Sequence, residues 1–269
     1  MQINLQFFWT ILGGFSIAFH IWLIFSGLIP NLVSRPLHMA LALPWCLMYG
    51  RSGNSFRIGT LLTGLGVLAC GYIILNQELL AEQYGYISSL WQGGIAILLL
   101  IIVLEMARRS IGWPLPVVAL IALCYGLYGQ YLPGEFGHPG LPLNSFLGTM
   151  TIAEGGIWGK LTGVSVNVVA IFVIFGAVLN AGEAGQGFMN LAMAAAGRLK
   201  AGLAKVSVLS SALFGSISGS ASANVASTGS FTLPAMIRQG YPRDFAAAVE
   251  AVASSGGQIM PPLMGAGAF

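Results

Sequence analysis

The sequence predicts an all-α integral membrane protein, a multi-span helical bundle, and two observations carry this prediction. Only 7% of the 269 residues are charged, 56% are hydrophobic, and the mean hydropathy is +0.82. A soluble domain carries about 25% charged residues, so this chain lacks the polar side chains to cover a soluble surface. Its apolar runs are long and continuous, whereas a membrane β-barrel shows alternating segments of about ten residues.

The charge pattern excludes a nucleic-acid-binding surface and predicts a membrane orientation. The basic residues are scattered, and Arg108-Arg109 is the only adjacent pair. By the positive-inside rule, loops with Arg and Lys face the cytoplasm. Arg51 and Arg57 are separated from Arg108-Arg109 by two predicted spans, so we expect all four residues, and the N-terminus, on the cytoplasmic side.

We expect six membrane spans, because a helix needs about 20 apolar residues to cross the hydrocarbon core. They cover residues 7–29, 37–49, 58–76, 88–104, 113–132 and 161–182, the second being short. The first four form a four-helix membrane unit over residues 1–110, followed by a connecting helix and loop over 111–140. Residues 183–200 are expected as a helix along the cytoplasmic interface.

The apolar stretch Val206–Ile237 lies between Lys205 and Arg238 and is interrupted at Ser218–Ser222. It is longer than one crossing and shorter than two, which need about 20 and about 40 residues. Basic residues at both ends place both ends on one side. We therefore expect a re-entrant helical hairpin that enters from the cytoplasm, with its tip near the midplane.

The next helix is expected to be discontinuous. It carries Glu250, breaks at Gly256-Gly257 and meets Pro261-Pro262, which cannot continue it with normal hydrogen bonds. From Asp244 to Gly257 the helix spans about 20 Å, so the break falls at the depth of the hairpin tip. Glu250 is either a proton or ion partner or one half of a structural ion pair.

Broken helices of this kind predict a binding site, because non-helical backbone in hydrocarbon must be satisfied. Carbonyl groups at the end of the first hairpin arm, with Ser and Asn oxygens, suit a small hard cation. N–H groups at the start of the second arm, near Asn224–Thr228, suit a carboxylate. Close helix packing remains the alternative explanation for Gly215 and Gly219.

These segments resemble the large, DctM-like permease subunit of TRAP (tripartite ATP-independent periplasmic) transporters, most closely the TAXI-type branch, in which a four-helix small subunit is fused ahead of the large one. The resemblance rests on FGSISGSASANVASTGSFTLP (214–234), GYP (240–242) and AVEAVASSGGQIMPPLMGA (248–266). It covers roughly residues 140–269, and it implies that residues 141–269 are the first repeat of an inverted-repeat elevator transporter.

The resemblance implies a sodium-driven importer of organic acids, such as C4-dicarboxylates or related carboxylates, in a bacterial inner membrane. It also implies a periplasmic substrate-binding protein as partner and no cofactor besides the coupling sodium ion. The implied sodium ligands are Ser218, Gly219, Ser220, Asn224, Ser254, Ser255, Gly256 and Gly257. The implied substrate-binding residues are Ser222, Asn224, Thr228, Gln258, Pro261 and Pro262.

The sequence ends at Phe269 within an apolar run, and the second repeat of the family does not follow. We therefore expect this chain to be an N-terminal part of a longer protein, with the first repeat incomplete and one half of the site present.

An intramembrane hydrolase would need a base near the serines, and the three histidines, His20, His38 and His138, all precede them by a long way. A permease that hydrolyses ATP itself would need a phosphate-binding loop. The glycine-containing segment from Gly155 to Lys160 lacks the spacing of such a loop. A permease that works with a separate ATPase subunit stays open as an alternative.

Overall fold

The computed structural model describes residues 2–27, 29–182, 184–218, 221–257 and 259–260, and there it is helical without strands, which confirms the all-α membrane class. The chain divides into two compact units, Met1–Val166 and Asn167–Phe269. The boundaries predicted at residues 110 and 140 are of another kind, because they separate segments expected to resemble the small and the large permease subunit. That division stays a prediction.

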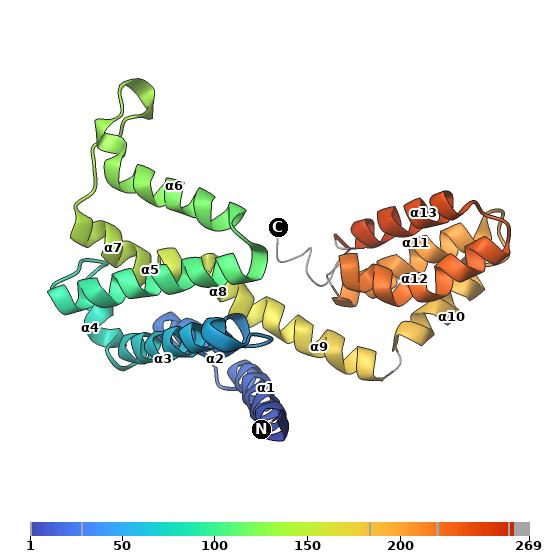
Figure 1. The fold of residues 1–269 in the computed structure, drawn as a ribbon, viewed down its shortest axis with the longest axis horizontal. Coiled ribbons are helices and arrows are strands. Elements are labelled where there is room, and N and C mark those ends of the chain that lie inside the picture. Colours follow the sequence, from blue (N-terminus) through green and yellow to red (C-terminus); the bar gives the residue numbers. More distant parts are fainter. Residues whose placement is uncertain (1, 28, 183, 219–220, 258, 261–269) are drawn as a thin grey trace. The chain divides into compact units, whose positions relative to one another are not determined.

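The first unit is built from antiparallel and crossing helices, several of which are seen side by side in Figure 1. Its elements are α1 (Gln2–Phe25), α2 (Asn31–Leu47), α3 (Gly53–Leu75), α4 (Gln77–Glu82), α5 (Leu90–Ile111), α6 (Pro114–Tyr128), the 3₁₀ turns Gly129–Tyr131, Gly134–Phe136 and Gly156–Trp158, α7 (Leu143–Thr151) and α8 (Lys160–Val164). Residues buried from α2, α3, α5 and α7 form one hydrophobic core.

Five helical segments of the described residues are long and apolar enough to cross a membrane. They are Gln6–Phe25, Gly53–Leu75, Leu90–Ile111, Pro114–Tyr131 and Leu143–Phe175. The first four correspond to predicted spans, and the fifth overlaps the predicted span 161–182. The predicted span 37–49 corresponds to α2, which begins earlier, at Asn31, because its first turns bury Leu32 and Pro36.

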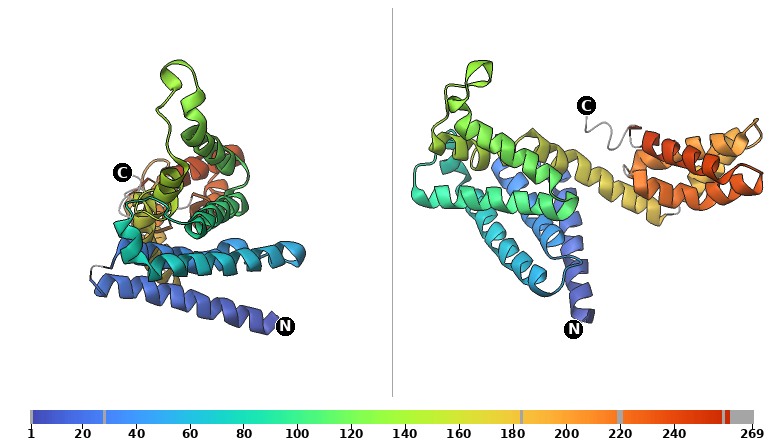
Figure 2. Two further views of the ribbon diagram at one scale, coloured as in Figure 1. Left: turned by 90° about the vertical axis from the view of Figure 1, so that its left-hand side faces the viewer. Right: turned by 45° about the horizontal axis from the view of Figure 1, so that its top comes forward.

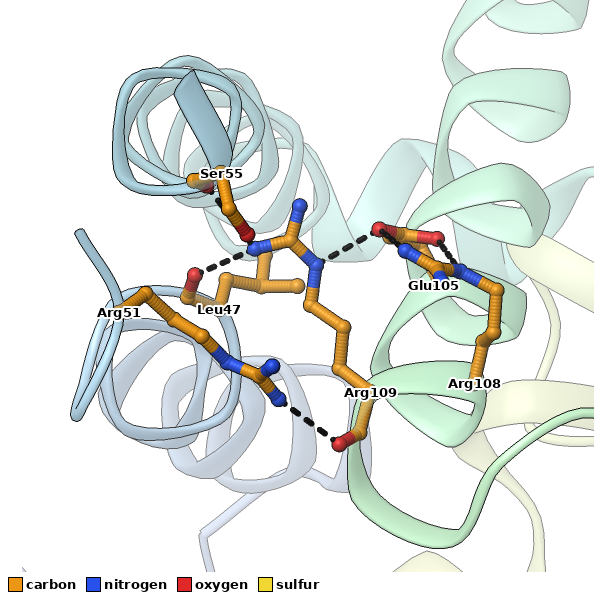
Figure 3. A network of polar contacts seen from close by, with 6 residues as sticks. All are labelled: Leu47, Arg51, Ser55, Glu105, Arg108 and Arg109. Atoms are coloured by element: carbon orange, nitrogen blue, oxygen red, sulfur yellow. Dashed lines mark hydrogen bonds and ion pairs between the residues drawn. The ribbon is translucent and has the colours of Figure 1, made fainter. Parts of the chain in front are cut away.

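Arg109 ties the ends of three helices together in the first unit (Figure 3). Its side chain is 4% exposed and pairs with Glu105 at 2.6 Å within α5. One guanidinium nitrogen also donates to the carbonyl oxygens of Leu47, at the end of α2, and Ser55, at the start of α3. Arg51 in turn donates to the Arg109 carbonyl oxygen at 3.0 Å. Arg51 and Arg109 therefore lie at the same end of the first unit, and their predicted place on the cytoplasmic side stays a prediction.

The second unit begins with the π-helical segment Ser165–Val169 at the boundary and continues, over the residues that the structure describes, with five helices. They are α9 (Ala170–Ala181), α10 (Ala184–Ala196), α11 (Gly202–Ser218), α12 (Ala221–Arg238) and α13 (Arg243–Gly257). Figures 1 and 2 both show α11, α12 and α13 lying alongside one another, and each of them contacts the other two.

The hairpin prediction is confirmed as far as its two arms are concerned, because α11 and α12 pack on each other on either side of residues 219–220. The arms are longer than expected, because α11 begins at Gly202 and holds Lys205 within its first turn. With 17 and 18 residues, each arm is about 26 Å long. Re-entry from the cytoplasm and a tip near the midplane stay predictions.

We expect replacement of Arg109 by Ala to destabilise the first unit. The change removes the Arg109 donor from the carbonyl group of buried Leu47 at the end of α2 and removes a charged hydrogen bond to Glu105, each costing about 1–3 kcal/mol. Thermal unfolding in detergent should show a clearly lower midpoint. Arg57→Ala is the matched control, because Arg57 is exposed. Equal midpoints for the two variants would contradict the role given to Arg109.

Candidate ion and solute site

Helices α11, α12 and α13 enclose a buried polar cluster in the second unit. Its members are at most 4% exposed and comprise Ser207, Ser211, Asn224, Thr228, Thr232, Glu250 and Ser254. Polar groups buried in this way must be hydrogen-bonded, and none of their side-chain oxygen and nitrogen atoms is left unpaired in the described structure. The cluster therefore forms a self-contained hydrogen-bond network.

The spacing of these residues explains why three helices can build the cluster. Residues four apart lie on one face of an α-helix. Ser207 and Ser211 on α11 have this spacing, as do Thr228 and Thr232 on α12. Glu250 and Ser254 repeat it on α13. Each helix thus presents one polar stripe, and the three stripes meet in the middle of the bundle.

Glu250 is the centre of the cluster, because hydroxyl groups of all three helices donate to its carboxyl group. Ser207 Oγ lies 2.7 Å and Thr232 Oγ1 lies 2.5 Å from Glu250 Oε2. Thr228 Oγ1 donates to the other oxygen, Oε1, and Ser254 Oγ lies 3.3 Å from it. The carboxyl group is therefore fixed by α11, α12 and its own helix at once.

The rest of the cluster links Glu250 to the first turn of α12. Asn224 Nδ2 donates to the Ser211 carbonyl oxygen at 2.8 Å. The Ser211 hydroxyl lies 3.2 Å from Thr228 Oγ1 and 3.5 Å from Ser254 Oγ. These contacts join the start of α12 to the body of α11 and to α13.

No cation pairs with Glu250 among the described residues, whose salt bridges both involve Glu105. The basic residues of the three helices, Lys205, Arg238 and Arg243, are exposed. The alternative that Glu250 belongs to a structural ion pair therefore has no support among the described residues. Its surroundings are hydroxyl groups instead.

Two glycines allow the end of α13 to approach the hairpin. A Cβ atom on Gly215 would lie 2.4 Å from the Gly257 carbonyl oxygen, and one on Gly257 would lie 2.5 Å from the Ser211 carbonyl oxygen. No real Cβ contact is so short, so these positions need glycine. The packing explanation therefore holds for Gly215. The predicted end of the helix at Gly257 is confirmed as well.

The structure brings together four of the predicted site residues, namely Asn224, Thr228, Ser254 and Gly257. Two others point elsewhere: Ser255 is exposed and donates to the Ala251 carbonyl oxygen, and Gly256 is exposed with open space around it. The side chains of Ser218 and Ser222 are not described, and Gly219, Ser220, Gln258, Pro261 and Pro262 lie outside the described residues. Their predicted roles as ligands stay predictions.

The sequence-based site missed Ser207, Ser211 and Thr232. They lie about two or three helical turns away from the glycine-rich breaks on which the prediction concentrated. The signal that could have found them is the shared spacing of four residues in α11, α12 and α13. A polar residue repeated at this interval within an apolar helix indicates a buried polar stripe.

Residues 98–269 match the family described as "Tripartite ATP-independent periplasmic transporter, DctM component". The chain is 35% identical over 128 residues to the C4-dicarboxylate TRAP transporter large permease protein DctM of Rhodobacter capsulatus, covering 46% of this chain and 29% of that protein. It is 37% identical over 94 residues to the isethionate TRAP transporter permease protein DctMQ of Oleidesulfovibrio alaskensis, covering 35% and 15%.

A third relative is the ectoine TRAP transporter large permease protein TeaC of Halomonas elongata, 33% identical over 101 residues, which cover 38% of this chain and 24% of that protein. The matched segments thus span less than a third of the length of each of these three relatives. No solved structure matches the chain significantly.

We expect Gly257→Ala to disrupt the contact between α13 and the hairpin, because its Cβ atom would meet backbone and the Asn224 amide group. Overpacking of this kind costs about 1–3 kcal/mol, and the midpoint of thermal unfolding in detergent should fall accordingly. Gly256→Ala is the neighbouring control, since open space surrounds Gly256. If both variants unfolded at the same temperature, the close approach of the helices would be refuted.

Proposed function

Because the family match covers well over half of its residues, the chain belongs to the DctM component family of tripartite ATP-independent periplasmic transporters, and we propose that its protein is the permease of a secondary active importer. The importer would take up small organic acids, driven by an ion gradient. The single observation that carries the proposal is the buried polar cluster within α11, α12 and α13. It occurs in the part of the chain that matches this transporter family.

The proposed solutes are carboxylates, such as C4-dicarboxylates. The relatives are named for C4-dicarboxylates, isethionate and ectoine, so a family of transporters with different solutes shares this segment. The start of α12 offers backbone N–H groups and the positive end of a helix dipole, which favour an anion. Asn224, held by the Ser211 carbonyl group, lies in this first turn.

Sodium is the proposed coupling ion. The C-terminal end of α13 lies against α11, where the backbone of Gly257 closely approaches Gly215. Helix C-termini present free carbonyl groups and partial negative charge, which attract a small cation. Discontinuous helices in many transporters bind ions in this way. A cation and a carboxylate bound at neighbouring helix ends would stabilise each other, which would link uptake of one to the other.

The proposed setting is the bacterial inner membrane, with the N-terminus in the cytoplasm and a periplasmic binding protein delivering the solute. The clustering of Arg51 and Arg109 at one end of the first unit supports this orientation under the positive-inside rule. The TAXI-type arrangement, with a four-helix unit ahead of the permease segment, is part of the same proposal.

The function is tested by reconstituting the protein, expressed from its complete reading frame, in liposomes with its binding protein. We expect an inward sodium gradient without ATP to drive accumulation of a radiolabelled C4-dicarboxylate or related carboxylate. A sodium ionophore should abolish the accumulation. Uptake that ignores sodium and requires ATP with an additional subunit would contradict the proposal and favour an ATP-driven permease.

Asn224→Ala should lower the rate of this uptake about fivefold or more, because it removes a buried hydrogen bond at the start of α12, and losing a buried partner costs about 1–3 kcal/mol. The comparison is Ser230→Ala, on the same helix, whose exposed hydroxyl group bonds only to the Ser227 carbonyl oxygen. An Asn224→Ala protein that is fully folded and transports at the unaltered rate would refute the assignment of the site.

A further inference from the structure

The end of the first unit where Arg109 joins α2, α3 and α5 carries a positive charge (Figure 3). Four arginines and one acidic residue lie there and leave a net charge of +3, namely Arg51, Arg57, Arg108, Arg109 and Glu105. The other acidic residues described in this unit lie beyond the opposite ends of α2, α3 and α6, and they are Glu78, Glu82, Glu135 and Glu154. Because α3 is 23 residues long, or about 35 Å, carboxylates beyond its far end do not neutralise these arginines.

Two of these arginines have donors to spare. The Nε and Nη2 atoms of Arg108 donate to Glu105 at 2.6 and 2.7 Å, whereas its Nη1 atom has no hydrogen-bond partner among the described residues. Arg57 is exposed and takes part in no salt bridge with a described residue. A guanidinium group presents its N–H donors as a planar fork that matches the oxygens of a phosphate group. Arg57 and Arg108 are therefore available to bind an anion.

Trp113 indicates that this end of the unit lies at the level of the lipid headgroups. The guanidinium carbon of Arg108 lies 5.3 Å from the centroid of the Trp113 ring, within the range of about 6 Å for a cation–π contact. Trp113 is nevertheless 62% exposed. Exposed tryptophans are enriched where the hydrocarbon core of a membrane meets the headgroup layer. Arginine side chains near helix ends extend toward the same layer.

Two apolar grooves begin at this basic end. The inner groove, of about 420 Å³, lies between α3, α5 and α6, where apolar side chains such as Leu62 and Leu120 line it and Arg108 lines its charged end. The outer groove, of about 630 Å³, lies on the surface of α3, where it begins at Arg57 and reaches Leu68. Each groove therefore joins a guanidinium group to a strip of apolar surface.

The length and placement of the grooves fit the two acyl chains of one lipid. The outer groove extends from Phe56 to Leu68, which is about 18 Å along the helix, and one leaflet is half of a hydrocarbon core about 30 Å thick. Successive helical residues are turned by about 100°, so Leu61 in the outer groove and Leu62 in the inner groove lie on neighbouring faces of α3. A single protein helix would not fill two grooves on different faces.

Helix α6 has little packing of its own, so it would gain most from an occupant of the inner groove. Pro116 is the only buried residue of α6, although Pro114–Tyr131 is long and apolar enough to cross a membrane. An acyl chain in the inner groove would contact α3, α5 and α6 together, and such van der Waals contacts hold membrane helices in place.

We propose that this end of the first unit binds an anionic phospholipid, with the phosphate group held by Arg57 and Arg108 and one acyl chain in each groove. Glu105 also lines the inner groove, but its two oxygens already accept hydrogen bonds from Arg108 and Arg109. Its charge is therefore compensated within the protein, and the surplus positive charge favours a headgroup with a net negative charge. The proposal goes beyond the transport function and does not depend on it.

Native mass spectrometry of the complete protein, freed of lipid in a neutral detergent, tests the proposal. The protein is titrated with dioleoyl phosphatidylglycerol and dioleoyl phosphatidylethanolamine, which differ only in their headgroups. We expect phosphatidylglycerol to bind at least about fivefold more tightly, and combined Arg57→Gln and Arg108→Gln to weaken its binding about fivefold for each residue. Lys160→Gln is the control, because Lys160 is exposed and lines neither groove. Equal affinities for the two lipids, or an unaltered affinity in the double variant, would overturn the proposal.

A second variant tests the acyl chains and keeps the test decisive if the arginine variant fails to fold. Gly64 lines the outer groove, and a Cβ atom added to it would meet no atom within 4 Å. Gly64→Leu should therefore fill the groove and weaken phosphatidylglycerol binding severalfold, whereas Gly94→Leu, at an equally open position on α5, should not.

Two other occupants would give different results. Weaker binding in the arginine variant with no effect of Gly64→Leu would indicate a site for a free anion and would overturn the assignment to a lipid. A dimer that retains no phosphatidylglycerol would show that a second copy of the chain covers the grooves, and it would overturn the proposal as well. None of these measurements requires transport.

Discussion

A buried carboxyl group that is satisfied only by hydroxyl groups is the interaction on which the second unit depends. Glu250 lies on α13, and its partners come from α11 and α12 as well as from its own helix. Because an unsatisfied buried carboxyl group is costly, the position of each helix is constrained by the other two. The hairpin and the helix that follows it are therefore held as one packed element.

Small residues allow the same three helices to pack closely where α13 ends. Gly215 and Gly257 let the end of α13 approach the backbone of α11, and Asn224 donates to that backbone beside them. Polar contacts and close packing thus act on the same three helices. In the first unit, Arg109 on α5 has a comparable role, since it donates to carbonyl oxygens at the end of α2 and the start of α3.

Much of this architecture could be predicted from the sequence. Long apolar runs identified the membrane class, and glycines located the end of α13 and the separation between α11 and α12. The depth of the breaks in the membrane and the roles of the residues around Gln258 could not be derived from the sequence. The length of a helix indicates how far it extends, but it does not show which residues contact one another. The hydroxyl groups of Ser207 and Thr232 were missed, since the prediction followed helix breaks, whereas their signal is a four-residue spacing inside regular helices.

The most direct test of this account is a double-mutant cycle between α11 and α13, measured as free energies of unfolding in detergent. Ser207→Ala and Glu250→Ala are combined, with Ser207→Ala and Ser230→Ala as the reference pair. If Glu250 holds the helices together, the first pair should be non-additive by at least about 0.5 kcal/mol, whereas the distant pair should add. Additivity of the first pair would show that the Glu250 contact does not couple the helices and would contradict the account.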